Sequence, residues 1–209
     1  MILKESMQRL IPDAGLNSSQ EYDKIYLERS KKQVDSQDMK RWRRLLKYYK
    51  GGKILDAGCL DSKVVELIVD KKMYWGIDIA EKAIASMQVK YPEADYSLQD
   101  LYKTDFKNES FEYVVLGEVL EHLENVEFAI KESFRVLKRG GYLALSVPLE
   151  EIKEPGAVDG LRHLYSFSVK DIINLLKPYG STKVSTLGSE FFPVYKYHWK
   201  TLLGYCKKK

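Results

Sequence analysis

Two aspartates that each follow a short apolar run are the residues of this chain best placed to do chemistry. Asp56 lies in the segment KILDAGC, residues 53–59, directly before a glycine turn. Asp78 ends a second apolar run, after an interval long enough for one helix. In a strand–turn–helix–strand unit of this kind, the turn and the helix N-terminus face a ligand. A carboxylate at the end of the second strand can accept hydrogen bonds from both hydroxyls of a ribose, so we expect a cofactor that carries a nucleoside.

The turn after Asp56 excludes several nucleotide-binding motifs. It reads GCLDS over residues 58–62 and keeps only the first glycine of the G-x-G-x-x-G pattern. The P-loop lysine pattern is also absent. The turn therefore offers no evident cradle for a pyrophosphate, which argues against a nicotinamide or flavin cofactor. A nucleoside site without phosphates remains.

Strand-like and helix-like segments alternate through the middle of the chain, which predicts a parallel sheet with right-handed crossovers. Residues 36–50 form an amphipathic helix ahead of it, and Tyr22, Ile25 and Tyr26 are the docking points of a shorter helix. We expect strands at 53–58, 73–79, 94–99, 113–118 and 141–147, and helices at 62–70, 81–90 and 125–138.

The pattern changes after Pro148. Residues 149–165 are charged and contain proline and glycine, so we expect a long loop at the ligand-binding edge of the sheet. A helix follows at 168–177, with Ser168 as its N-cap and Asp171 in the capping-box position. The aromatic tail predicts a hairpin at one edge of the sheet over residues 182–199 and a disordered basic end at 207–209.

Composition limits the class of protein. A chain of 209 residues with 44% hydrophobic content can bury one substantial core. A net charge of +4 is too small to indicate nucleic acid by itself. Cys59 and Cys206 are not spaced as metal ligands and fit a reducing compartment. The first residues lack the apolar run of a signal peptide, and no stretch has the length of a membrane span. We expect a cytoplasmic protein.

Over roughly residues 50–180 the chain resembles the class I S-adenosylmethionine-dependent methyltransferases, in particular the methyltransferase type 11-like family. The resemblance rests on ILDAGC at 54–59, GIDI at 76–79, QDL at 99–101, FEYVV at 111–115, EVLEHL at 118–123 and SFRVLKRGGYL at 133–143. It implies an α/β, Rossmann-like, doubly wound and mostly parallel seven-stranded sheet. The sheet would carry an N-terminal helical extension and a C-terminal antiparallel hairpin. Residues 1–50 would form a helical cap, and residues 51–209 the cofactor-binding domain.

The resemblance implies S-adenosyl-L-methionine as the cofactor. Gly58 would let the backbone approach its amino-acid moiety, and Asp56 would orient the turn and could reach its ammonium group. Asp78 would take the ribose hydroxyls, and Asp100 the adenine amino group, with the Leu101 N–H facing the ring. Capping of turns is the alternative for Asp56 and Asp100. The expected cofactor-binding residues are Asp56, Gly58, Cys59, Asp78, Ile79, Asp100, Leu101 and Glu118.

A hydroxyl acceptor needs a base, and an imidazole base must come from His122, His163 or His198. The first two follow the fourth and fifth expected strands, so we predict His122 and His163 as catalytic residues. Glu118, Glu121 and His122 share one face if their turn is helical. With His163 opposite, they resemble the metal site of small-RNA 2′-O-methyltransferases, and similar residues occur in quinone-biosynthesis O-methyltransferases. We favour a solvated helical turn as the explanation of these residues, and we predict no bound metal.

The function implied is methyl transfer to a small-molecule or lipid-precursor acceptor, at oxygen. The alternatives are an RNA methyltransferase and a cofactor-binding protein without transferase activity. Residues 40–53 hold seven basic residues and no acid, interleaved with aromatic residues. They could grip an anionic substrate, a membrane surface or RNA phosphates. We favour the interpretation that these basic residues form the solvent-facing side of a helix. Nucleic acid is therefore not an expected partner. The sequence leaves the oligomeric state open.

Overall fold

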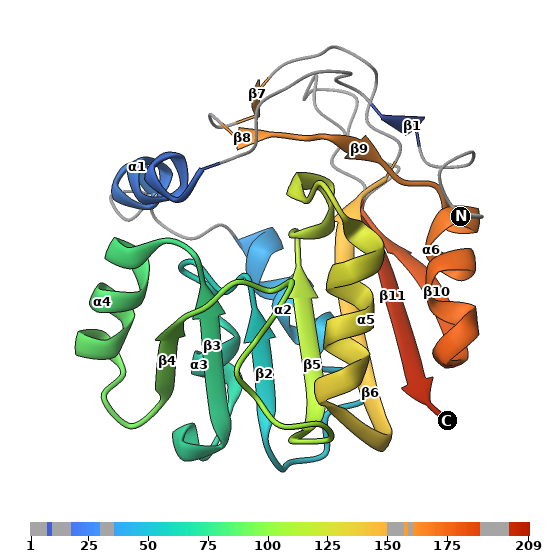
Figure 1. Ribbon diagram of the computed structural model, residues 1–209, viewed down its shortest axis with the longest axis horizontal. Helices are drawn as coiled ribbons and strands as arrows, with labels where there is room; N and C mark the ends of the chain where they lie inside the picture. The colour runs from blue at the N-terminus through green and yellow to red at the C-terminus, as the bar shows by residue number, and fades with distance from the viewer. Residues whose placement is uncertain (1–7, 10–17, 30–35, 150–156, 159–160, 189–200) are drawn as a thin grey trace.

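The structure is a computed structural model that describes residues 8–9, 18–29, 36–149, 157–158, 161–188 and 201–209. Its centre is one sheet of seven strands (Figure 1). The strands are β2 (Ile54–Ala57), β3 (Tyr74–Asp78), β4 (Asp95–Leu98), β5 (Phe111–Gly117), β6 (Leu137–Pro148), β10 (Gly180–Leu187) and β11 (Thr201–Lys208). Their order is β10-β11-β6-β5-β2-β3-β4, and β11 alone runs in the opposite direction to the other six. The mostly parallel sheet and the C-terminal hairpin are confirmed.

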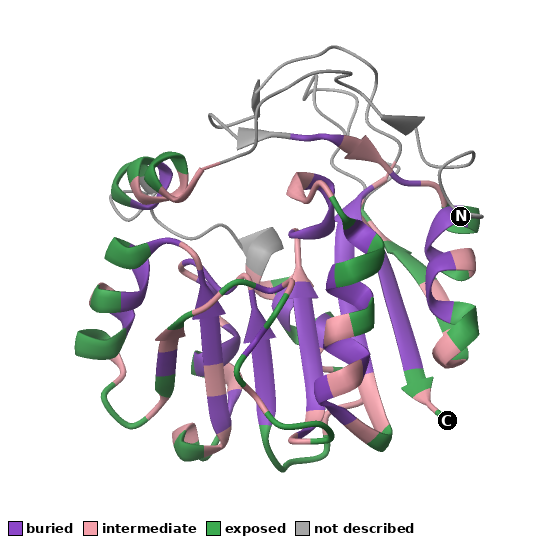
Figure 2. Ribbon diagram, in the orientation of Figure 1, coloured by how far each residue is buried: buried purple, intermediate pink, exposed green. Residues whose placement is uncertain are grey.

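Helices cover both faces of the sheet and make two cores. The helices are α1 (Ser19–Arg29), α2 (Ser36–Leu45), α3 (Val64–Leu67), α4 (Glu81–Lys90), α5 (Val126–Val136) and α6 (Val169–Leu176). Apolar residues of α2, α3 and α4 share one buried cluster, and those of α5 and α6 share the other. In Figure 1, α5 lies in front of the sheet, with α2 and α3 behind it. Figure 2 shows the inner strands buried and the outer helix faces exposed, as hydrophobic burial requires.

Two helices follow their sequence signals closely. Helix α4 spans the predicted residues, and α6 begins with the predicted capping box, in which the side chains of Ser168 and Asp171 each bond the other's backbone N–H. Helix α3 is only one turn long, because the chain is already extended at Ile68 and Asp70 then caps the separate short helix η1 (Lys71–Met73). Helix α2 ends at Leu45 and continues as turns.

The C-terminal end of the chain is ordered, so the prediction of disorder at 207–209 was wrong. The second hairpin strand is β11, which was not anticipated in the sequence. Its Lys208 donates from Nζ to the carbonyl oxygens of Phe134 and Leu137, at 2.8 and 2.6 Å. These bonds hold the strand end against the turn between α5 and β6. The aromatic residues at 191–199, including His198, lie outside the described residues.

Short elements gather beyond the carboxyl ends of the parallel strands (Figure 1). They are α1 and the two-residue strands β1 (Gln8–Arg9), β7 (Ala157–Val158), β8 (Leu161–Arg162) and β9 (Tyr165–Ser166). Strand β9 pairs with β1, and β7 pairs with β8. The expected long loop therefore carries short strands, although much of it lies outside the described residues. Among the residues described, we find no helix long and apolar enough to cross a membrane.

Candidate active site

The turn after β2 is closed tightly onto β3. Gly58 has a φ of +76°, and a Cβ at this position would lie 2.6 Å from Cγ2 of Val119, so only glycine fits. The N–H groups of Gly58 and buried Cys59 both donate to the carbonyl oxygen of Ile77, at 2.8 and 3.0 Å. These N–H groups, which we expected to face a ligand, are used within the protein. Gly58 instead brings the turn against Val119, at the end of β5.

Asp56 is directed into the interior. It is 1% exposed, and its Oδ2 accepts a 2.8 Å hydrogen bond from the hydroxyl of Tyr74. Burial raises the pKa of Asp56 to about 6, although hydrogen bonds from Ser62 and Tyr74 act in the opposite direction. This placement indicates that Asp56 holds the turn in place. It does not favour contact between Asp56 and the ammonium group of a cofactor.

Asp78 lies at the carboxyl end of β3, where it ties the glycine turn to the start of α4. Its Oδ2 accepts from the N–H of Leu60 at 2.8 Å, and its Oδ1 accepts from the N–H of Ala80 at 2.9 Å. Each carboxylate oxygen can accept a further bond. Burial raises the pKa of Asp78, and hydrogen bonds from the N–H groups of Ala80, Leu60 and Ile79 partly oppose that rise. Leu60 has a φ of +34°, a backbone conformation that strains a residue with a side chain. Ile79 is half-buried beside this group.

The segment between β4 and β5 carries the expected adenine-binding residues. Asp100 is exposed, and its Oδ1 accepts from the N–H of Tyr102 at 2.8 Å, which is a turn-capping contact. Leu101 is buried in the core, with 8% exposure. The Tyr102 hydroxyl accepts a 3.1 Å bond from the N–H of Asn125, which fixes the segment to the start of α5.

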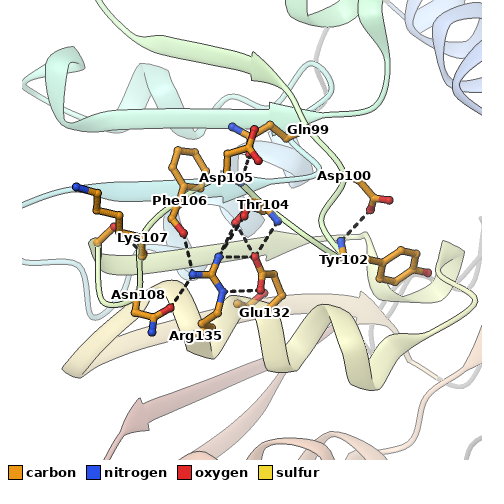
Figure 3. A network of polar contacts seen from close by, with 12 residues as sticks. Gln99, Asp100, Tyr102, Thr104, Asp105, Phe106, Lys107, Asn108, Glu132 and Arg135 are labelled. Carbon is orange, nitrogen blue, oxygen red and sulfur yellow. Dashed lines mark hydrogen bonds and ion pairs between the residues drawn. The ribbon is translucent and has the colours of Figure 1, made fainter.

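A network around Arg135 of α5 holds the rest of this segment (Figure 3). The guanidinium donates to the carbonyl oxygens of Phe106 and Thr104, at 2.7 and 3.2 Å, and to Oδ1 of Asn108 at 2.8 Å. It also forms two 2.7 Å bonds with the carboxylate of Glu132. The bond from Arg135 lowers the pKa of Glu132 to about 2. Figure 3 shows the Tyr102 ring pointing away from this network, so Arg135 leaves the ring free of the network.

Glu118 follows β5 with a strained backbone and an arginine partner. Its φ is +57°, and its N–H donates to the carbonyl oxygen of Ser146 at 3.0 Å. Nη1 of Arg41 lies 3.4 Å from Oε2 of Glu118, and its guanidinium lies 4.5 Å from the Trp42 ring centre. Within the described part of the chain, Oε1 of Glu118 is buried without a hydrogen-bond partner. This pair could not be predicted from the sequence, because Arg41 is one of several basic residues on α2.

The two predicted histidines lie together. The ring centres of His122 and His163 are 4.8 Å apart, and Nε2 of His122 lies 4.0 Å from Oε1 of Glu121. One potential ligand atom from each of the three residues lies within 4.8 Å of the others. The N–H of Leu164 donates to the carbonyl oxygen of Glu121 at 2.6 Å, and this bond sets His163 beside His122. We refer to Glu121, His122 and His163 as the histidine cluster.

Glu118 does not join the histidine cluster, because the helical turn on which a shared face of Glu118, Glu121 and His122 depended is not formed. That face required an α-helical turn through all three residues. The turn is instead the short 3-10 helix η2 (Leu120–His122), and Glu118 precedes it in a left-handed backbone conformation. The side chain of Glu118 is paired with Arg41.

Helix α1 adds an aromatic residue that the sequence predicted only as a docking point. Ile25 and Tyr26 are buried, at 4% and 8% exposure, so their docking is confirmed. Tyr22 packs against the small cluster of Tyr26, Leu60, Ala80 and Ala83. Its ring lies edge-on to that of His122, with centres 6.4 Å apart. Tyr22 therefore reaches from the surroundings of Asp78 to the histidine cluster.

The chain is similar to known methyltransferases. Residues 55–145 match the family model described as a methyltransferase domain. The chain is 29% identical over 150 residues to a protein of Mycolicibacterium smegmatis named probable S-adenosylmethionine-dependent methyltransferase, covering 70% of this chain and 58% of that protein. It is 29% identical over 117 residues to the demethylmenaquinone methyltransferase of Listeria welshimeri, covering 50% of each. The chain thus spans little more than half the length of these relatives.

The fold also matches solved structures. One is the 1,6-didemethyltoxoflavin N1-methyltransferase of Burkholderia thailandensis, with bound 1,6-didemethyltoxoflavin and S-adenosylhomocysteine. The TM-score is 0.69 at 16% identity, and the match covers 97% of this chain and 95% of that one. At this identity the similarity concerns the fold alone.

Proposed function

We propose that this chain is a class I S-adenosylmethionine-dependent methyltransferase that transfers a methyl group from S-adenosylmethionine to a small-molecule or lipid-precursor acceptor. The domain match over residues 55–145, the similar methyltransferase sequences and the fold support this proposal. The acceptor atom that we propose is oxygen. The cofactor would lie along the carboxyl ends of β2 and β3, with its sulfonium methyl directed toward the histidine cluster.

The position and hydrogen bonds of Asp78 are the main support for the cofactor assignment. Its two carboxylate oxygens are held in place by the N–H groups of Leu60 and Ala80, so little reorganisation is needed before a ribose binds. One remaining acceptor site on each oxygen matches the two ribose hydroxyls. The adenine would lie on the segment between β4 and β5, near Asp100 and Leu101. The network around Arg135 holds this segment in place.

The amino-acid end of the cofactor is a zwitterion, and the pair of Arg41 and Glu118 has complementary charges. Val119 packs against Gly58, so Glu118 lies next to the glycine turn, where this end of the cofactor would bind. Arg41 would bind the carboxylate, because a guanidinium forms strong charge-assisted bonds with it. Glu118 would accept from the ammonium group through its buried Oε1, in the role that we first considered for Asp56.

Methyl transfer from a sulfonium is an in-line displacement in which positioning does much of the work. The new bond joins the methyl carbon to the acceptor oxygen as the carbon–sulfur bond breaks. S-adenosylhomocysteine leaves, and the hydroxyl proton passes to a base. We assign that base to His122 or His163, which lie together where the methyl group would point. Removing a general base of this kind costs on the order of 10²–10⁴ in rate.

The histidine cluster also has the donor set of a divalent cation site. One carboxylate and two imidazoles suit several transition metals, and the carboxylate of Glu121 is buried. A bound cation would lower the pKa of an acceptor hydroxyl and reduce the need for a base. We favour a histidine base over a bound cation. The effect of a chelator on activity distinguishes these two roles.

A small-molecule acceptor is favoured by the name of one similar protein, the demethylmenaquinone methyltransferase. An RNA acceptor is the second candidate, on account of the basic residues at 40–53. A cofactor-binding protein without transferase activity is the third, because the turn after Asp56 is poor in glycine.

The test combines calorimetry with methyl transfer. Wild-type protein should bind S-adenosylmethionine and S-adenosylhomocysteine, and Asp78→Ala should weaken both at least about tenfold, since each lost charge-assisted bond contributes roughly 1.5–3 kcal/mol. Exposed Asp95→Ala is the matched control. Radiolabelled methyl transfer to quinol precursors, small phenols and RNA then separates the candidates. Failure to bind either cofactor form would overturn the proposal, and binding without transfer to any acceptor would favour the third candidate.

A further inference from the structure

Helix α1 is attached to the part of the sheet edge where the cofactor ribose would bind. Asp23 of α1 accepts a 2.8 Å bond at its Oδ1 from the N–H of Lys82, and so caps the first turn of α4. One turn further along, Tyr26 packs with Leu60 and Ala80. Leu60 and Ala80 are the residues whose N–H groups hold Asp78. The helix is therefore positioned by the same residues that position the ribose-binding carboxylate.

Tyr22 lies between that carboxylate and the histidine cluster. On one side it packs against the Leu60 and Ala80 cluster, and on the other its ring is edge-on to His122. Burial and the nearby charges of Asp78 and Glu121 raise the pKa of its hydroxyl, so the side chain stays neutral. An aromatic ring in this position is flanked by two carboxylates and exposes no charge of its own.

The position of the Tyr22 ring fits one part of the cofactor. In the function proposed above, the ribose binds at Asp78 and the methyl group points toward His122. The sulfonium joins the ribose to the methyl group, so in this placement it would lie beside the Tyr22 ring. An aromatic face attracts a cation within about 6 Å, and the attraction is largest at desolvated sites. S-adenosylmethionine carries this positive charge, whereas S-adenosylhomocysteine does not.

We propose that Tyr22 contacts the sulfonium and makes the protein prefer the charged cofactor over the neutral product. The preference would help product to leave after each methyl transfer. It depends on the ring and not on the hydroxyl, because the attraction comes from the aromatic face. The inference rests on the proposed function, since it requires the cofactor to occupy the site beside Asp78.

The experiment compares the affinities of S-adenosylmethionine and S-adenosylhomocysteine by calorimetry on the full chain. Tyr22→Leu should lower the ratio of the two affinities about tenfold, by weakening the charged form selectively. Tyr22→Phe should keep the wild-type ratio. Tyr26→Leu is the matched control, because it disturbs the docking of the same helix without removing the ring from beside His122. It should change both affinities by the same factor.

The outcomes separate this inference from the proposed function. Equal weakening of both forms in Tyr22→Leu would reduce Tyr22 to a structural role and overturn the inference, and so would loss of the preference in Tyr22→Phe. Thermal melting of each variant checks that it is folded. If Tyr22→Leu does not fold, the ratio measured for Tyr22→Phe still tests the inference. If wild-type protein binds neither form, the proposed function is wrong and the inference fails with it.

Discussion

The hydroxyl of Tyr74 donates a 2.8 Å hydrogen bond to Oδ2 of Asp56, so the acid at the end of β2 faces the protein interior. Both side chains are almost completely buried. Asp56 pairs in the sheet with Gly76 of β3, where a Cβ would lie 2.6 Å from Cε1 of Tyr96 and 3.0 Å from Sγ of Cys59, so the packing beside Asp56 requires glycine there. An acid that sequence patterns associate with the cofactor is thus part of the support beneath the turn.

The burial of Asp56 predicts a specific pH dependence of stability. Its pKa is raised from 3.8 to about 6, so the folded protein binds a proton that the unfolded chain releases in this range. The stabilisation is complete below about pH 4 and is lost as the pH rises through about 6, a change of about 3 kcal/mol. Asp56→Asn keeps the shape but cannot titrate. The free energy of unfolding of wild type, relative to this variant, should therefore fall by about that amount between pH 4 and pH 7.

Denaturant unfolding at several pH values measures this difference, and exposed Asp95→Asn serves as the control for general charge effects. Its stability relative to wild type should not follow the same curve. A constant difference between wild type and Asp56→Asn across pH 4 to 7 would show that Asp56 is ionised in the folded protein throughout this range.

The Arg41–Glu118 pair predicts a selective loss of cofactor affinity. Arg41→Met removes the group that we assign to the cofactor carboxylate, and S-adenosylmethionine and S-adenosylhomocysteine should both bind about tenfold more weakly or worse. Both forms carry the same carboxylate, so their ratio should stay constant. Arg43→Met changes an exposed arginine on the same helix and should leave both affinities unchanged. Equal effects in the two variants would point to the overall charge of α2 instead.

The network around Arg135 predicts both a stability cost and a local loosening. Arg135→Lys keeps the charge but cannot reproduce the forked bonds to Glu132 and the backbone, so we expect a loss of about 1–3 kcal/mol in the free energy of unfolding. Arg139 is the matched control. It is 80% exposed and pairs with Glu109 at 3.7 Å, so Arg139→Lys should cost less than about 0.5 kcal/mol.

Hydrogen exchange gives the local readout for the same variant. Amides of residues 103–108, which Arg135 holds against α5, should exchange faster in Arg135→Lys than in wild type. The exchange rates of amides in β2 and β3 should change only as far as the global free energy of unfolding changes. If residues 103–108 stay as protected as in wild type, the network is not what orders this segment.

The sequence predicted the elements with the most regular patterns. Helix α4 and the capping box of α6 depend on local signals, and the structure confirms both. The apolar runs of β2, β3 and β5 also mark strands that are buried on both faces. The seven-stranded, mostly parallel sheet was implied by the family resemblance, but no strand order was predicted, because periodicity alone does not say which strands are neighbours.

The features that the sequence missed depend on contacts between distant segments. Residues 207–209, at the end of strand β11, were predicted to be disordered because they are all lysines, yet Lys208 bonds carbonyl groups about seventy residues away. Arg41 and Glu118 come together only through the packing of α2 on the sheet. Asp56 faced the ligand in our interpretation because spacing along the chain does not reveal that Tyr74 lies behind it.

The last prediction concerns His122 and His163, which lie 4.8 Å apart by ring centres at the point where the transferred methyl should arrive. If one of them is the base, its removal slows the chemistry without weakening the cofactor. His122→Ala and His163→Ala should keep calorimetric affinity for S-adenosylmethionine within about threefold of wild type, while at least one loses about a hundredfold or more in turnover. A cation site predicts instead that a chelator abolishes activity and that Mg²⁺ or Mn²⁺ restores it. Full turnover in both variants, together with no effect of a chelator, would exclude both roles and leave catalysis to positioning of the acceptor alone.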